Sequence, residues 1–216
     1  MLLRKILLIA ILAVVSTPSF AQFTLGLKFS PTLSTNRIDA SSDSTSFGSD
    51  GTGVRVALGP IADIEIRENY FLSTGLLFVS KRVGVEATTN NNATEQTTFK
   101  EEYSLQYLQV PITLKLFTNE VALDKKIYFQ VGGTLDFNIN EEPKSQENFL
   151  IEDFLIFDSS LLIGMGMEYK VGVNTVLFGG LTYQRGLVNA INEHAPLDGD
   201  FSLKNDYISL DLGVKF

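Results

Sequence analysis

The chain has 216 residues, of which 17 are basic and 25 are acidic, and it contains no cysteine. The absence of cysteine excludes disulfides, thiolate chemistry and cysteine-based metal sites. Without Arg4 and Lys5, residues 22–216 keep 15 basic against 25 acidic residues, a net charge of −10. That charge argues against nucleic acid, and against docking on anionic lipid head groups through a basic patch.

The first 21 residues are typical of a secretory signal peptide. Arg4 and Lys5 precede a short apolar run at 6–15, and the small residues around Phe20 offer a cleavage site after Ala21. The apolar run is too short to cross a bilayer as a helix. We therefore expect a signal peptide over residues 1–21 and one domain over residues 22–216.

Segments that alternate apolar and polar side chains, with the period of two of a β-strand, follow the signal peptide. They cover residues 23–34, 52–66, 70–85, 99–117, 126–139, 153–171, 175–187 and 206–216. No later segment reaches the roughly 18–20 apolar residues of a membrane helix. If the domain lies in a membrane, it must therefore be a closed barrel, because only a barrel then satisfies every backbone group.

The connections between these segments alternate in length. The first, third, fifth and seventh are long and polar, at residues 35–51, 86–98, 140–152 and 188–205. The second and sixth, at 67–69 and 172–174, are short, and the fourth, at 118–125, fits least well. Outer-membrane barrels alternate long outer loops with short periplasmic turns in this way. The pattern predicts an all-β fold: an eight-stranded antiparallel up-and-down transmembrane β-barrel in the bacterial outer membrane.

The last segment is typical of the final strand of such a barrel. One of its faces is entirely apolar and ends on an aromatic residue: Ile208, Leu210, Leu212, Val214 and Phe216. We expect this face to act as the barrel-insertion signal that the barrel-assembly machinery recognises.

The opposite faces of the segments collect charged residues of both signs. We expect ten of them to form a lumen charge network: Lys28, Arg55, Asp63, Glu65, Lys81, Lys115, Asp136, Glu168, Asp211 and Lys215. An eight-stranded barrel leaves only enough interior for side chains to fill, and buried charges there should be paired. The lumen is therefore expected to be closed by charged side chains. Leu162 and Phe178 also fall inward in this register.

Residues 107–115 (Tyr-Leu-Gln-Val-Pro-Ile-Thr-Leu-Lys) resemble the Tyr-hydrophobic-Glu-hydrophobic-Pro strand of the PorT-like small outer-membrane barrels. Gln109 stands where that family often has Glu, and residues 75–81 and 183–189 support the resemblance. Pro111 marks a bulge or bend, because proline donates no ladder hydrogen bond. The resemblance implies an eight-stranded barrel of the porin family, and PorT itself is tied to protein secretion across the outer membrane.

Few residues offer chemistry. His194 is the only histidine, and Asp200 and Ser202 follow it closely, which leaves open an outer-membrane enzyme with a rim site near His194. Acidic residues at 198–200 and 141–153 leave Ca²⁺ binding open. The sequence also leaves open a channel and a soluble ligand-binding barrel.

The leading interpretation is a structural or interaction role, with no enzyme activity, cofactor or metal. The expected partners are outer-membrane lipid around the barrel, the assembly machinery, and an envelope protein that contacts the outer loops. The resemblance adds an envelope or secretion-system component as a more specific role.

Overall fold

The computed structural model describes residues 23–40, 45–92, 95–144, 151–194 and 201–216, so the predicted signal peptide lies outside the described residues. The strands are β1 (Phe23–Ala40), β2 (Thr45–Ser49), β3 (Gly53–Arg67), β4 (Tyr70–Gly75), β5 (Leu77–Asn92), β6 (Glu95–Phe117), β7 (Lys125–Pro143), β8 (Ile151–Phe154), β9 (Phe157–Lys170), β10 (Val176–Gly186), β11 (Ile191–His194) and β12 (Phe201–Lys215). No helix in the described part of the chain is long and apolar enough to cross a membrane.

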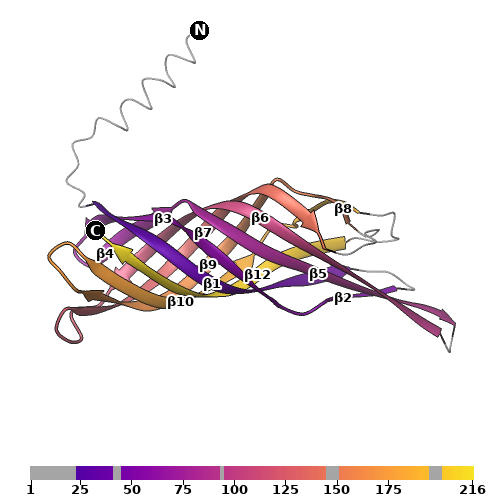
Figure 1. The fold of residues 1–216 in the computed structure, drawn as a ribbon, viewed down its shortest axis with the longest axis horizontal. Coiled ribbons are helices and arrows are strands. Elements are labelled where there is room, and N and C mark those ends of the chain that lie inside the picture. Colours follow the sequence, from indigo (N-terminus) through magenta and orange to yellow (C-terminus); the bar gives the residue numbers. More distant parts are fainter. Residues whose placement is uncertain (1–22, 41–44, 93–94, 145–150, 195–200) are drawn as a thin grey trace, which may run out of the picture.

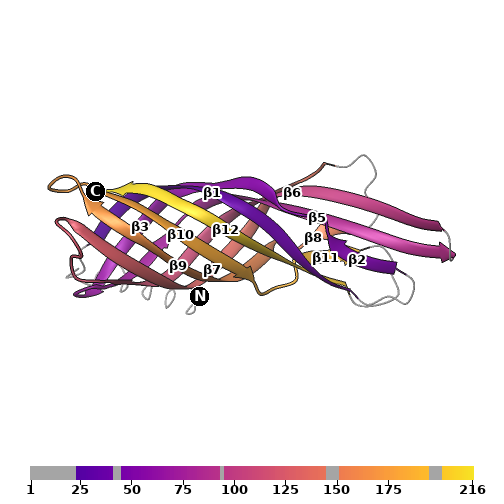
Figure 2. The ribbon, with the colours of Figure 1, turned by 90° about the horizontal axis from the view of Figure 1, so that it is seen from below.

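The strands close into one antiparallel ring (Figure 1). From β1 the order runs through β3, the interrupted strand β4–β5, β6, β7, β9, β10 and β12. The first and last strands seal the barrel, since β1 pairs with β12 over most of its length, and Figure 2 shows the two strands side by side. The predicted eight-stranded up-and-down barrel is confirmed.

One barrel strand is interrupted between β4 and β5 at Leu76, whose N–H donates to the carbonyl of Pro60 at 3.0 Å. The facing strand β6 pairs with β4 up to Ile112 and with β5 from Gln109 onward. Pro111 therefore lies opposite the interruption, where no ladder hydrogen bond is required of its nitrogen. The irregularity predicted at Pro111 lies instead in the neighbouring strand, at the β4–β5 interruption, because β6 pairs with β7 in regular register through Pro111.

Much of the predicted outer loops is strand instead. β5 continues to Asn92 and β6 begins at Glu95, and they pair across this whole stretch, so the expected connection at 86–98 is wrong. β1 likewise continues to Ala40, and β11, within the predicted connection at 188–205, forms a small sheet with β8. β8 spans the predicted boundary at 152–153, so the barrel strand expected at 153–171 begins only at Phe157 as β9. The outward face of these segments meets water instead of lipid, so it carries no apolar alternation, but threonine-rich strands still pair well. β2, β5 and β6 project furthest from the barrel (Figure 1).

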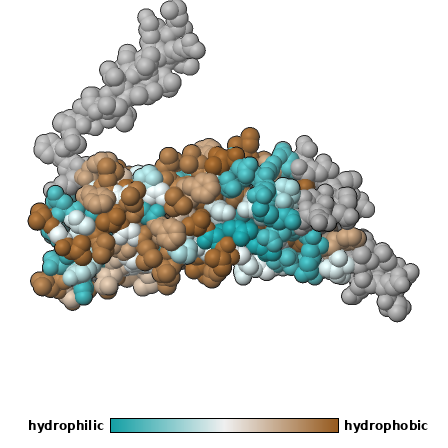
Figure 3. All heavy atoms as spheres, viewed as in Figure 1, coloured by the Kyte–Doolittle hydropathy of each residue, from teal (hydrophilic) through white to brown (hydrophobic). Residues whose placement is uncertain are grey.

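Apolar side chains point outward around the barrel body. Phe29, Ile112 and Leu181 are 51%, 48% and 56% exposed, which only a lipid environment makes favourable. Figure 3 shows this apolar band, with hydrophilic residues toward the end from which β2, β5 and β6 project. Leu162 and Phe178 are buried inside, as their register predicts.

The outer part of the interior is an apolar core. Inward positions of β5, β6 and β12 meet the β8–β11 sheet there, and the cluster includes Val79, Val83, Val85, Tyr103, Leu105, Leu203, Ile151, Phe154 and Ile191. Ile151, Ile191 and Leu203 of this core lie in predicted connections, and its other named members lie in predicted strands. The core closes the barrel above the charged lumen.

Candidate functional site

The periplasmic level of the lumen holds two cations and two anions. The ammonium of Lys115 lies 3.1 Å from Asp63 Oδ2 and 3.9 Å from Glu168 Oε1, and the ammonium of Lys215 pairs with the same two carboxylates. The hydroxyl of Ser73 donates to Asp63 as well. The four charges cancel, and both lysine side chains are almost completely buried.

The middle level is built around Asp211. Its Oδ2 lies 2.8 Å from the ammonium of Lys28 and accepts a hydrogen bond from Thr182 at 2.6 Å. Its Oδ1 accepts from the hydroxyls of Ser30 and Ser209, each at 2.8 Å. Every lone-pair direction of this carboxylate is therefore used, which is what a buried charge requires.

The outer level of the lumen is built around Lys81. Its ammonium lies 2.7 Å from Asp136 Oδ2, 3.1 Å from Asp158 Oδ2 and 4.4 Å from the centre of the Tyr107 ring. The three charged side chains are at most 1% exposed. Asp158 is not among the predicted lumen residues, although it shares the inward register of Leu162. Buried side chains thus occupy the described lumen at three levels.

Two of the ten predicted lumen residues are placed differently. Arg55 pairs with Glu102 at 3.2 Å, in the outer strand extensions, and Glu65 is half-buried near the periplasmic end without an ion pair to a described residue. The other eight join the three levels above. On the last strand, Ile208, Leu210, Leu212 and Phe216 are exposed to lipid and Val214 is half-buried. Their recognition by the assembly machinery stays a prediction.

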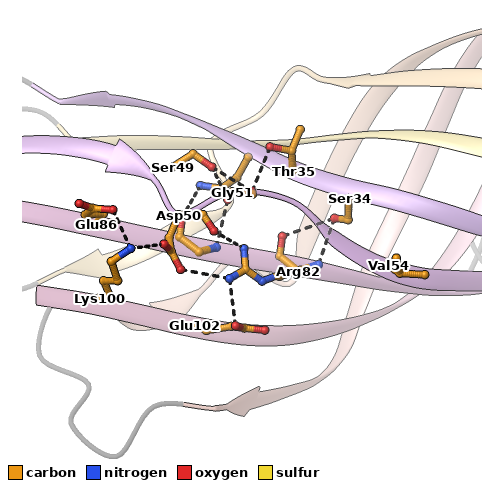
Figure 4. A network of polar contacts seen from close by, with 12 residues as sticks. Ser34, Thr35, Ser49, Asp50, Gly51, Val54, Arg82, Glu86, Lys100 and Glu102 are labelled. Carbon is orange, nitrogen blue, oxygen red and sulfur yellow. Dashed lines mark hydrogen bonds and ion pairs between the residues drawn. The ribbon is translucent and has the colours of Figure 1, made fainter.

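A second polar network lies outside the barrel body, between β2, β5 and β6 (Figure 4). The guanidinium of Arg82 donates to the Asp50 carbonyl at 2.5 Å, to Asp50 Oδ2 at 3.2 Å and to Glu102 Oε2 at 2.9 Å. Lys100 adds ion pairs with Asp50 at 2.6 Å and with Glu86 at 3.0 Å. With Arg55, this outer network has three cations and three anions, so it is neutral.

The outer network exists because the barrel wall is irregular at this point. β3 pairs with β5 only around Leu58, and β2 meets β5 again only from Ser49. Between these points, side chains of β1 replace the missing ladder: the N–H of Arg82 donates to Ser34 Oγ at 3.0 Å, and the N–H of Gly84 donates to Asn36 Oδ1 at 3.0 Å. Arg82 then fills the space at the break between β2 and β3.

The ion pairs of the outer network shift the pKa of its acidic members. The hydrogen bond from Lys100 lowers the pKa of Asp50, and the hydrogen bond from Arg82 lowers the pKa of Glu102, both against the effect of burial. Hydrogen bonding to Glu102 raises the pKa of Arg82. Asp50, Glu102 and Arg82 are therefore charged at neutral pH, and their contacts hold β2 against the β5–β6 hairpin.

The candidate rim site and the candidate calcium site lie largely outside the described residues. The backbone of His194 pairs with Ile151 in the β8–β11 sheet, but its side chain and Asp200 lie outside the described residues. Ser202 lies on β12 opposite Asp39 of β1. No three or more His, Asp or Glu residues gather into a metal site within the described ranges, and residues 198–200 lie outside them.

A closed β-ring with an apolar outer band and a filled polar lumen defines an integral outer-membrane β-barrel protein. Residues 20–192 match the family model described as "Outer membrane protein beta-barrel domain", and the chain belongs to this family. No curated protein sequence is significantly similar to the chain.

Solved structures share the fold. Neisserial surface protein A is similar with a TM-score of 0.52 and 12% identity, covering 91% of this chain and 98% of that one. OprG from Pseudomonas aeruginosa gives 0.51 and 11%, covering 91% and 96%. AlkL in lipid bilayers gives 0.52 and 12%, covering 93% and 92%. At these identities the likeness shows the fold alone.

Proposed function

We propose that this protein is a non-conducting outer-membrane barrel that acts by contact, through its outer strand extensions, with another envelope protein. The observation that supports this best is the closed interior: three levels of paired charge lie below an apolar core. A barrel without an open lumen can bind a partner at its surface but gives solutes no route through its interior. The role is non-catalytic in this proposal, and His194→Ala leaves it unchanged.

The shape of the outer side favours a contact role. β5 and β6 extend as a long hairpin, and the outer network ties β2 to it, so the three strands form one supported surface (Figure 4). Phe99 on β6 is 51% exposed there, and such an exposed aromatic side chain is a common anchor at protein interfaces. The resemblance to PorT-like barrels makes a secretion-system component the finer form of this proposal.

Conductance tests the closed lumen. The refolded protein in a planar bilayer should give no steady conductance. Lys81→Ala combined with Lys115→Ala, which removes cations from two lumen levels, should raise conductance if water and ions enter the loosened interior. Steady conductance of the unmodified protein would overturn the proposal in favour of a channel.

Site-specific photo-crosslinking in intact cells tests the contact surface. A photoreactive residue at Phe99 should give one discrete adduct with an envelope protein. The matched control is Val173, an exposed apolar residue in the turn between β9 and β10 at the opposite end of the barrel. An adduct at Val173 and none at Phe99 would place the contact on the periplasmic side and contradict the proposal.

A further inference from the structure

Three cations come together on the outward face of β1, β12 and β10. Arg37 of β1 lies directly opposite Lys204 of β12, and Arg185 of β10 lies directly opposite Asp206, two residues along β12 from Lys204. Directly opposed side chains have Cβ atoms about 5 Å apart, and diagonal neighbours are about 7 Å apart. One small anion between the three side chains is therefore within reach of all of them.

The acidic residues present neutralise this cluster only in part. The guanidinium of Arg37 donates to Asp206 at 2.6 and 3.2 Å and to the carbonyl of Gly186 at 2.9 Å. Asp39, two residues further out on β1, also faces this side. Arg185 and Lys204 form no ion pair with any described residue. Because opposed like charges destabilise a strand pair, the Arg37–Lys204 pair favours an added anion.

The other cations on the outer side each have an acidic partner. Arg55, Arg82 and Lys100 are each paired within the neutral outer network, and Lys144 pairs with Glu142. Among the described residues on that side, Arg185 and Lys204 are thus the cations left without an acidic partner. The excess positive charge is confined to one sector of a strongly acidic chain.

This sector lies at the boundary of the apolar band. On the outward face of β1, Thr35 and Leu33 follow Arg37 toward the middle of the membrane. On the two neighbouring strands, the next outward residues in that direction are Ile208 after Asp206 on β12 and Tyr183 after Arg185 on β10. Leu33 and Ile208 are 53% and 51% exposed, so they contact acyl chains. Directly above acyl-chain contacts, the nearest groups of an outer-leaflet lipid are its phosphates.

We propose that Arg185, Lys204 and Arg37 bind the phosphate of an outer-leaflet lipid at a fixed site on the barrel. Arg185 offers the forked N–H pair that matches phosphate geometry, and Lys204 adds a point charge. Leu33, Ile208 and Tyr183 below them receive the acyl chain of the same molecule. The lipid phosphate thereby supplies the anion that this sector lacks.

The test is native mass spectrometry of the folded protein in a nonionic detergent, with phosphatidic acid as the phosphate-bearing lipid and phosphatidylcholine as the comparison. The wild-type protein should retain one phosphatidic acid in preference to phosphatidylcholine. Arg185→Gln with Lys204→Gln should weaken this binding roughly 30-fold, about fivefold for each cation near a lipid surface. Lys126→Gln with Lys170→Gln, which makes the same charge change at the periplasmic end, should leave it unchanged.

Two further arms make the result specific. Arg185→Lys keeps the charge but loses the forked donor, so it should weaken binding less than Arg185→Gln. An excess of inorganic phosphate should not displace the lipid, because it gains nothing from the apolar residues below. Equal retention by the wild-type and double-variant proteins, equal loss in the periplasmic control, or full displacement by inorganic phosphate would each overturn the lipid site.

Discussion

Replacing Lys81 with methionine isolates the energetics of the filled lumen. The ammonium of Lys81 is the shared partner of Asp136 and Asp158, which lie directly opposite each other on β7 and β9 and are at most 1% exposed. Without it, two like charges face each other with no counter-charge. Removing one partner of a buried ion pair costs about 3–5 kcal/mol, so Lys81→Met should lower the free energy of unfolding by at least that much.

The rescue variant makes this reasoning testable. Adding Asp136→Asn and Asp158→Asn to Lys81→Met removes both stranded charges, and the triple variant should recover most of the loss, to within about 1–3 kcal/mol of wild type. Urea unfolding in lipid vesicles, followed by far-UV circular dichroism, measures all three proteins, since the chain has no tryptophan. Lys144→Met, in an exposed pair, is the control and should cost less than about 1 kcal/mol. A triple variant no more stable than Lys81→Met alone would refute the charge argument.

Two further outcomes follow from other contacts. The lowered pKa values of Asp50 and Glu102 mean that the outer network contributes stability above their ordinary values of 3.8 and 4.5 and loses it as the pH falls through the lower folded-state values. Hydrogen-exchange protection of β2 should thus fall between pH 7 and pH 3 relative to β12, and equal changes in both strands would contradict this. In the lumen, Gly213→Val places a side chain against the Leu27 carbonyl oxygen and the Phe178 ring and should cost about 1–3 kcal/mol in the same urea assay, whereas an unchanged midpoint would show that the ring and the β1 backbone both move aside.

The barrel can be predicted from the sequence because strand alternation and short turns recur along the whole chain. Alternation with period two identifies which residues face lipid, and Phe29, Leu181 and Ile208 are indeed exposed. Short turns are equally readable, since Asn69 adopts a positive φ of 66° in the turn between β3 and β4. These features depend on local geometry, so the sequence contains them in full.

The strand extensions are not predictable from the sequence for a physical reason. Beyond the membrane both faces of a strand meet water or a small apolar core, and the alternation that marks a lipid face disappears. Thr88 and Thr98 pair across the β5–β6 hairpin although the sequence around them is typical of a loop. The break between β2 and β3 depends on Arg82 meeting Ser34 from a distant strand, which no local pattern encodes.

For the charged sites, too, the sequence predicts the local pattern but not the contacts between distant strands. The inward register correctly collects Lys81 and Asp136, but the choice of partners depends on how strands pair across the lumen, and the prediction omits Asp158. The net charge of −10 for residues 22–216 argues against a basic patch, yet the strand register places Arg37 opposite Lys204. Contact with lipid phosphate depends on the charge within a few ångströms of the phosphate, since screening removes the influence of distant acidic groups. An acidic barrel and an anion-binding sector are therefore compatible within one chain.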